Sequence, residues 1–124
     1  MRLLLDTHVV LWWRLDSRRL HEDARRAIES ADRVLVSAAS AWEVAIKIAL
    51  GRLRLKDPFS TLVARSGFDE LPVTFAHTER LAALPVHYGD PFDRMLVVQA
   101  QVEDLTLVTH DRALEPHGVA VIWT

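Results

Sequence analysis

Cysteine is absent from the sequence, and glycine and proline are scarce, with four and five residues among 124. The lack of cysteine excludes a disulfide-stapled scaffold, a thiolate zinc site and a thiol nucleophile. No apolar run approaches the roughly 20 residues that a membrane-spanning helix needs. Only three leucines separate Arg2 from Asp6, which is too short an apolar segment for a secretory signal, so we expect a cytoplasmic protein with no membrane association.

An excess of charge of one sign is also missing. The chain has 15 Lys and Arg residues against 17 Asp and Glu residues, which gives a net charge of -2. This balance excludes a protein that binds nucleic acid through bulk positive charge alone. Because 50% of the residues are hydrophobic and the length is that of one domain, we expect a single globular domain over residues 1–124.

Short apolar runs alternate with longer helical patterns along the chain. Strands are expected at residues 3–5, 34–36, 71–73, 106–108 and 119–122. Helices are expected at residues 7–15, 20–31, 38–50, 58–67, 75–84 and 91–103. This alternation predicts an α/β fold in which helices cover both faces of a central parallel sheet of four to five strands. We expect Trp12, Trp13 and Trp42 to lie in its core.

Two aspartates come just after predicted strands. Asp6 follows the first strand, and Asp111 lies two residues beyond the strand that contains Leu107 and Val108. In open α/β sheets, ligands bind outside the carboxyl ends of the strands, near the point where the strand order reverses. An aspartate at such a position is also a common turn former or helix cap, so each acid has a purely structural alternative.

Two further acids lie in predicted helices. Glu43 is surrounded by apolar residues, so we expect its helix to be buried, and a buried carboxylate needs a partner or a metal. The alternative for Glu43 is an exposed ion pair with Lys47, four residues later. Asp93 follows Asp90 at a helix start, where both acids suit capping and the positive end of the helix. Two acids are nevertheless more than one helix start requires.

The acids together indicate a metal centre. They are Asp6, Glu43, Asp93 and Asp111. A doubly wound sheet can bring all of them to one edge, where carboxylates without a cation would repel one another. A divalent cation removes this conflict, and ligation by oxygen alone suits Mg²⁺ or Mn²⁺ rather than zinc. Because such an ion can activate water and stabilise charge on a phosphoryl oxygen, the sequence indicates hydrolysis of phosphodiesters.

Four segments carry a resemblance to a known family. They are Leu-Leu-Leu-Asp-Thr-His at 3–8, Ser-Ala-Ala-Ser-Ala-Trp-Glu-Val-Ala-Ile-Lys at 37–47, Asp-Pro-Phe-Asp-Arg-Met-Leu at 90–96 and Leu-Val-Thr-His-Asp at 107–111. With these segments in this order, the chain resembles the PIN-domain ribonucleases, and among them the VapC-like toxins of bacterial toxin–antitoxin pairs. The resemblance spans nearly the whole chain.

This resemblance implies a fold, an activity and partners. The fold would be a PIN-like three-layer sandwich, and the activity that of an Mg²⁺- or Mn²⁺-dependent endoribonuclease that acts as a toxin on RNA. Thr7 would orient the first acid or a metal-bound water, and it is a candidate for contact with the substrate. The partners would be a VapB-like antitoxin, lying along residues 9–15 and 44–55, and a second copy of the chain in a homodimer. The catalytic and metal-binding acids would be Asp6, Glu43, Asp93 and Asp111, with Asp90 as a candidate additional ligand.

Several basic side chains are candidates for contact with the substrate. Arg94, next to Asp93, is expected to meet the RNA strand or to offset the acids. Lys47 begins a basic stretch, residues 47–56, that contains no acid. His8 and His110 flank two of the acids and could touch substrate, although a solvated or capping role is the alternative for each.

Two other functional classes remain open on the residues alone. The first is a phosphotransfer module. A phosphatase-like module of this class needs Asp-x-Asp after its first strand, but His8 occupies the position of the second aspartate. A receiver-type module of this class needs a phosphorylatable aspartate after its middle strand, where this chain has Ser37. The second class is a non-catalytic α/β interaction domain, which would bind no Mn²⁺ and cleave no RNA.

Overall fold

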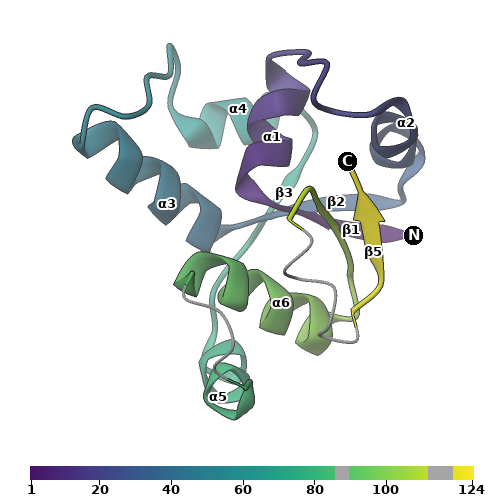
Figure 1. The fold of residues 1–124 in the computed structure, drawn as a ribbon, viewed down its shortest axis with the longest axis vertical. Coiled ribbons are helices and arrows are strands. Elements are labelled where there is room, and N and C mark those ends of the chain that lie inside the picture. The colour runs from purple at the N-terminus through teal and green to yellow at the C-terminus, as the bar shows by residue number, and fades with distance from the viewer. Residues whose placement is uncertain (86–89, 112–118) are drawn as a thin grey trace.

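The computed structural model describes residues 1–85, 90–111 and 119–124 (Figure 1). Its strands are β1 (Arg2–Leu5), β2 (Arg33–Ser37), β3 (Asp69–Leu71), β4 (Thr106–Thr109) and β5 (Val121–Trp123). Its helices are α1 (Thr7–Arg14), α2 (Glu22–Ser30), α3 (Ala38–Ala49), α4 (Phe59–Arg65), α5 (Phe75–Ala83) and α6 (Pro91–Glu103). Every strand and helix expected from the sequence is present, with bounds that differ by a few residues.

The strands form one parallel sheet in the order β3-β2-β1-β4-β5. The chain builds this sheet outward from β1 to β3, and then crosses to the other side of β1 to add β4 and β5. The strand order therefore reverses between β1 and β4, where Leu5 pairs with Val108. Asp6 follows β1 and Asp111 lies just beyond β4, so both acids flank the point at which such sheets bind ligands.

Helices cover both faces of the sheet (Figure 1). Because successive side chains of a strand point to opposite faces, β1 contributes Leu3 and Leu5 to one apolar cluster and Leu4 to the other. The first cluster takes residues from α1, α2 and α4, and the second takes residues from α5 and α6. All three leucines are 0% exposed, as expected for a central strand covered on both sides. The predicted three-layer α/β sandwich is confirmed.

The edge strands are displaced from their predicted positions. The third strand is Asp69–Leu71 rather than residues 71–73. Pro72 has no N–H to donate to a neighbouring strand, so pairing ends at Leu71. The last strand begins at Val121 rather than at residue 119, and its residues are only partly buried. Edge strands have one paired neighbour each, so their apolar pattern defines their limits less sharply than that of β1.

Helix α3 is much more exposed than its composition suggests. The prediction that it is buried is wrong, because Trp42 is 62% exposed and Leu50 is 61% exposed. Placing Trp42 in the core was therefore also wrong, whereas Trp12 and Trp13 pack against the first apolar cluster. The helix starts where β2 ends and contacts α1, α4 and α6, which leaves one apolar side uncovered. Among the described residues, no helix is long and apolar enough to span a bilayer.

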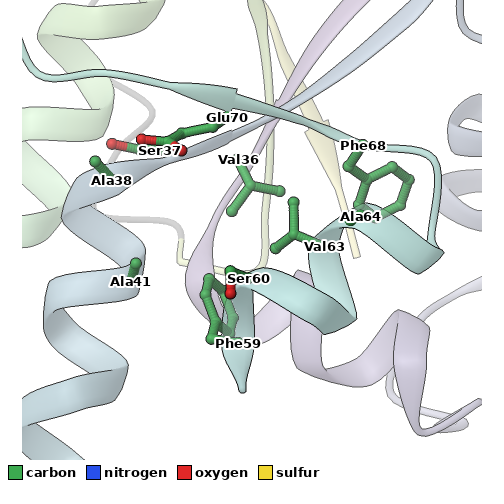
Figure 2. A pocket seen from close by; sticks show the side chains of 10 residues that line it. All are labelled: Val36, Ser37, Ala38, Ala41, Phe59, Ser60, Val63, Ala64, Phe68 and Glu70. Carbon is green, nitrogen blue, oxygen red and sulfur yellow. The ribbon is translucent and has the colours of Figure 1, made fainter. Parts of the chain in front are cut away.

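An apolar hollow of about 270 Å³ opens between α3 and α4 (Figure 2). Val36 of β2, Val63 of α4 and Phe68 line its inner part, and the small Ala41 of α3 leaves it open. Glu70 is the one carboxylate in its lining, so this hollow does not hold the acids that the sequence singles out.

Candidate metal centre

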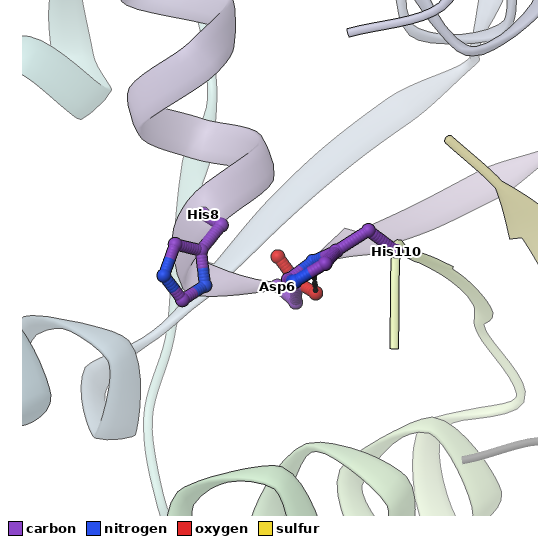
Figure 3. Close-up of side chains that lie close together, drawn as sticks. All are labelled: Asp6, His8 and His110. Atoms are coloured by element: carbon purple, nitrogen blue, oxygen red, sulfur yellow. Dashed lines mark ion pairs between the residues drawn. The ribbon is translucent and has the colours of Figure 1, made fainter. Parts of the chain in front are cut away.

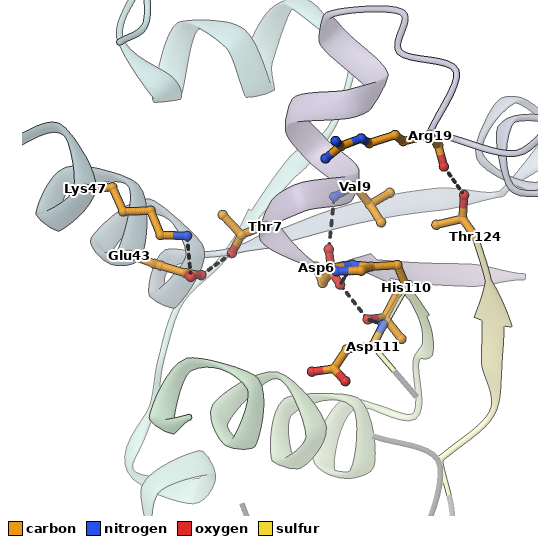
Figure 4. A network of polar contacts seen from close by, with 10 residues as sticks. Asp6, Thr7, Val9, Arg19, Glu43, Lys47, His110, Asp111 and Thr124 are labelled. Atoms are coloured by element: carbon orange, nitrogen blue, oxygen red, sulfur yellow. Dashed lines mark hydrogen bonds and ion pairs between the residues drawn. The ribbon is translucent and has the colours of Figure 1, made fainter. Parts of the chain in front are cut away.

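Asp6 is fixed at the end of β1 by three neighbours (Figure 4). Its Oδ1 accepts the Val9 backbone N–H at 2.9 Å, which also caps the start of α1. Its Oδ2 accepts the Thr109 hydroxyl and lies 3.5 Å from Nδ1 of His110. The capping alternative raised by the sequence is thus correct, but one carboxylate oxygen also faces the end of β4.

These contacts keep Asp6 charged although it is only 3% exposed. Burial alone would raise its pKa, but His110, the Thr109 hydroxyl and the Val9 amide stabilise the carboxylate, so the pKa lies below its ordinary value. The same contact with Asp6 raises the pKa of His110 against the opposing effect of burial, and Asp111 and Asp93 add to this increase. The ends of β1 and β4 therefore form one coupled electrostatic unit.

Asp93 and Asp111 complete a cluster of aspartates at this edge. Asp93 lies in the first turn of α6, and the backbone N–H of Asp111 donates to the Thr109 hydroxyl at 3.0 Å. The pKa of Asp93 is raised to about 7, first by burial, then by the negative charges of Asp90, Asp111 and Asp6, and by a hydrogen bond with Asp111. The structure thus brings three of the predicted acids together, and the charges of Asp6 and Asp111 contribute to the raised pKa of Asp93.

Asp90 lies at the edge of this cluster in a capping position. Its Oδ1 accepts the backbone N–H groups of Phe92 and Asp93, at 2.9 and 3.3 Å. Its charge nevertheless contributes to the raised pKa of Asp93. The helix start of α6 therefore supplies two acids with different tasks, one bonded to the backbone and one facing the other aspartates.

Glu43 reaches the site through Thr7. The Thr7 hydroxyl donates to Oε1 of Glu43 at 2.7 Å, and Lys47 lies 3.1 Å from Oε2 (Figure 4). Since Thr7 directly follows Asp6, this bond ties α3 to the end of β1. The Glu43 side chain is 13% exposed, so the predicted ion pair with Lys47 exists but is not a solvated surface pair. Lys47 forms an ion pair with Glu43, and the contact of Lys47 with substrate stays a prediction.

Arg94 contacts the backbone at the end of α5. Its Nη2 donates to the backbone carbonyl of Leu84 at 3.4 Å. Its contact with RNA and its offset of the acids stay predictions.

Two histidines, His8 and His110, lie close to Asp6. Asp6, His8 and His110 offer ligand atoms that all lie within 4.8 Å of one another (Figure 3). Thr109, which bonds Asp6 and Asp111, was not singled out at all. The signal that could have found it is its position as the last residue of the strand next to β1, because the ends of adjacent parallel strands meet at one edge.

The donor set fits a hard divalent cation. The pKa of Asp93 is raised to about 7 by burial and then by its acidic neighbours, and a cation would relieve the repulsion among these carboxylates. Carboxylate oxygens are the ligands that Mg²⁺ and Mn²⁺ prefer, and Mn²⁺ also accepts imidazole nitrogen beside them. The residues that would hold the ion are Asp6, Asp93 and Asp111, with Glu43 behind Thr7.

Comparisons with known proteins agree with this geometry. The model of the PIN domain family matches residues 3–117. Ribonuclease VapC22 of Mycobacterium tuberculosis is 34% identical over 118 residues, which cover 93% of this chain and 91% of that protein. Among solved structures, VapBC2 of Rickettsia felis, bound to a DNA fragment from its promoter, has a TM-score of 0.73 at 12% identity, covering 98% of both chains. FitAcB of Neisseria gonorrhoeae has a TM-score of 0.67 at 20% identity, covering 97% of this chain and 96% of that one.

Proposed function

The chain belongs to the PIN domain family, and on that basis we propose that it is a metal-dependent endoribonuclease, the toxin of a toxin–antitoxin pair. Its whole length would act as one PIN-like domain. The observation that carries the activity is that Asp6, Asp90 and Asp111 gather around Asp93 at the strand-order reversal. The relative named Ribonuclease VapC22 supports RNA as the substrate.

The residues of the chain have separate tasks in this mechanism. Asp6, held by the Val9 amide and the Thr109 hydroxyl, presents a carboxylate of fixed orientation. Asp93, whose pKa is raised to about 7, would have to be deprotonated to hold a cation, so metal binding would release a fraction of a proton at neutral pH. Thr7 orients Glu43, and Lys47 balances part of the charge of Glu43. When bound, Mg²⁺ or Mn²⁺ would lower the pKa of a coordinated water and balance charge on the scissile phosphate.

Incubation of total RNA with the protein tests this proposal. We expect cleavage in Mn²⁺ or Mg²⁺, none in EDTA, and 5′-phosphate ends at mapped sites, because the nucleophile is water and not the RNA 2′-hydroxyl. Cyclic phosphate ends would contradict the mechanism. Absence of both cleavage and Mn²⁺ binding would favour the alternative of a non-catalytic interaction domain.

The exposed side of α3 supports an antitoxin partner. Trp42, Ile46 and Leu50 recur every four residues, are 62%, 36% and 61% exposed, and so form one apolar helix face. Ile46, Leu50 and Phe92 line a shallow hollow beside Glu43 and Lys47, next to the candidate metal centre. An amphipathic helix of a VapB-like antitoxin would cover this face and lie beside the acids. A homodimer of the chain is the second association that we propose.

Coexpression with a candidate VapB-like antitoxin tests the antitoxin proposal. Purification of the tagged chain should recover the antitoxin, and Trp42→Ser with Leu50→Ser should reduce its recovery at least about tenfold, because both side chains would lose buried apolar area. Val102→Ser, at a residue that is 40% exposed on α6, is the matched control and should leave recovery unchanged. Equal recovery with all variants would place the antitoxin elsewhere.

A further inference from the structure

Three aromatic rings gather beside Asp6, at the edge of the first apolar cluster. The ring centroids of His8 and His110 are 5.0 Å apart, as are those of Trp12 and His110, and His8 and Trp12 are 5.9 Å apart. His8 and His110 are exposed and Trp12 is half-buried. Trp13, the next residue, packs on Phe68 of the first apolar cluster, and Trp12 also packs against that cluster. Trp12 in addition contacts the rings of His8 and His110.

Local geometry explains why these rings meet. His8 and Trp12 are four residues apart in α1, so both project from the same side of the helix. His110 follows β4, and β4 pairs with β1, whose end leads into α1. The rings thus come from the two strand ends that flank the strand-order reversal, which are also the strand ends that carry Asp6 and Asp111.

The rings meet at a tilt or edge to face. The ring planes meet at 44°, 79° and 59°, so no two of them are stacked face to face. An edge contact covers part of one ring face, and the exposure of His8 and His110 leaves their remaining surface open to a ligand. Nδ1 of His110 lies 3.5 Å from Oδ2 of Asp6, so anything resting on the rings lies beside the carboxylates.

We propose that His8, Trp12 and His110 form a stacking site for one nucleobase of single-stranded RNA, next to the phosphate that is cleaved. This rests on the proposed ribonuclease function. Single-stranded RNA is recognised largely by stacking of its bases on aromatic side chains, including histidine. The chain has no bulk positive charge to hold RNA, so a base contact of this kind would position the strand over the acids.

Binding of a short single-stranded RNA tests this site separately from catalysis. The probes are a five-nucleotide RNA and versions of it with one abasic position each, titrated in Ca²⁺, with intactness of the RNA checked on a gel. We expect one abasic position to weaken binding to the unmodified protein by roughly 5- to 100-fold, the range known for single base–aromatic contacts. His8→Ala and Trp12→Leu should weaken binding of the intact RNA by a similar factor and abolish the effect of that abasic position.

Control variants separate stacking from charge and from folding. His8→Phe keeps a ring without the imidazole nitrogens and should retain base-dependent binding, while His21→Ala, at an exposed histidine before α2, should change nothing. If Trp12→Leu fails to fold by circular dichroism, the exposed His8 variants carry the test. His110 is left unchanged because it contacts Asp6.

The outcomes distinguish the stacking site from the nuclease. If the protein cleaves RNA in Mn²⁺ but neither base removal nor His8→Ala alters RNA binding, the stacking site is wrong and the ribonuclease stands. If binding depends on the base and on His8 but no cleavage occurs, the stacking site stands and the ribonuclease is wrong. A protein that binds no RNA at all overturns the stacking site.

Discussion

Two polar regions lie at opposite ends of α6. They differ in whether their charged and hydrogen-bonding groups have complementary partners. At the start of α6, Asp93 lies near Asp6 and Asp111, and burial together with the neighbouring negative charges raises its pKa to about 7. At the end of α6, Glu103 lies 2.9 Å from Nε2 of His77, which is 0% exposed. Nδ1 of His77 accepts the Thr74 backbone N–H at 3.0 Å, within a capping box at the start of α5.

The difference shows which polar cluster serves structure and which serves chemistry. In the His77 region each donor meets an acceptor, so burial of the imidazole is compensated and the contact between α5 and α6 is stabilised. In the aspartate region Asp6 is held by donors, but Asp93 is partly buried among Asp90, Asp111 and Asp6, and both burial and their negative charges raise its pKa. A cation at the strand-order reversal would relieve that repulsion.

The largest expected effect is on cleavage after loss of Asp6. Asp6→Asn keeps an oxygen to cap α1 but removes the charge, so RNA cleavage in Mn²⁺ should fall by about 10³-fold or more, since the ion contributes several kcal/mol of charge stabilisation. Initial rates on a labelled RNA measure this. Asp23→Asn, in the first turn of α2, is the matched control. A folded Asp6→Asn protein that cleaves at the parent rate would contradict the site.

Loss of His77 should act on stability instead. His77→Ala leaves Glu103 and the Thr74 amide without their partner and opens a cavity, so the free energy of unfolding should fall by about 2–4 kcal/mol. Urea denaturation measures this, with the exposed Glu79→Ala of the same helix as control. The cleavage rate per folded molecule should stay unchanged, and a large drop in that rate would show that the two regions are coupled.

Loss of the Thr7 hydroxyl should weaken metal binding by a smaller amount. Thr7→Val keeps the shape of a buried side chain but frees Glu43 from its 2.7 Å bond, and outer-shell partners of this kind contribute about 10- to 100-fold to metal affinity. Titration with Mn²⁺ measures the change, and Thr78→Val on α5 provides a hydroxyl loss away from the acids. If both variants bind Mn²⁺ with the same affinity, Thr7 has no role in the metal site.

The smallest expected effect is a gain of stability without metal. The pKa of Asp93 lies near 7 in the folded chain and near 3.8 when unfolded, so the folded state binds more protons between these values and stability falls as pH rises through them. Asp93→Asn removes that loss, and in EDTA at pH 8 it should stabilise the protein by about 1–2 kcal/mol, because solvent screens part of the repulsion.

The pH profile of this gain distinguishes repulsion from other causes. The advantage of Asp93→Asn should be near zero at pH 3, grow up to about pH 7 and then level off, and saturating Mn²⁺ should reduce or reverse it. Denaturation curves of both proteins across this range measure it. A gain that is independent of pH would show that Asp93 is not strained by its acidic neighbours.

The sequence by itself determined the order of strands and helices, the parallel sheet and the position of Asp6 and Asp111 at strand ends. Those features follow from apolar periodicity and from residues close together in the chain. Only the tertiary structure decided that α3 leaves Trp42 exposed, that Thr7 holds Glu43, that Arg94 turns to Leu84 and that three rings meet beside Asp6. These depend on how elements far apart in the sequence pack against one another, and local patterns do not encode that packing.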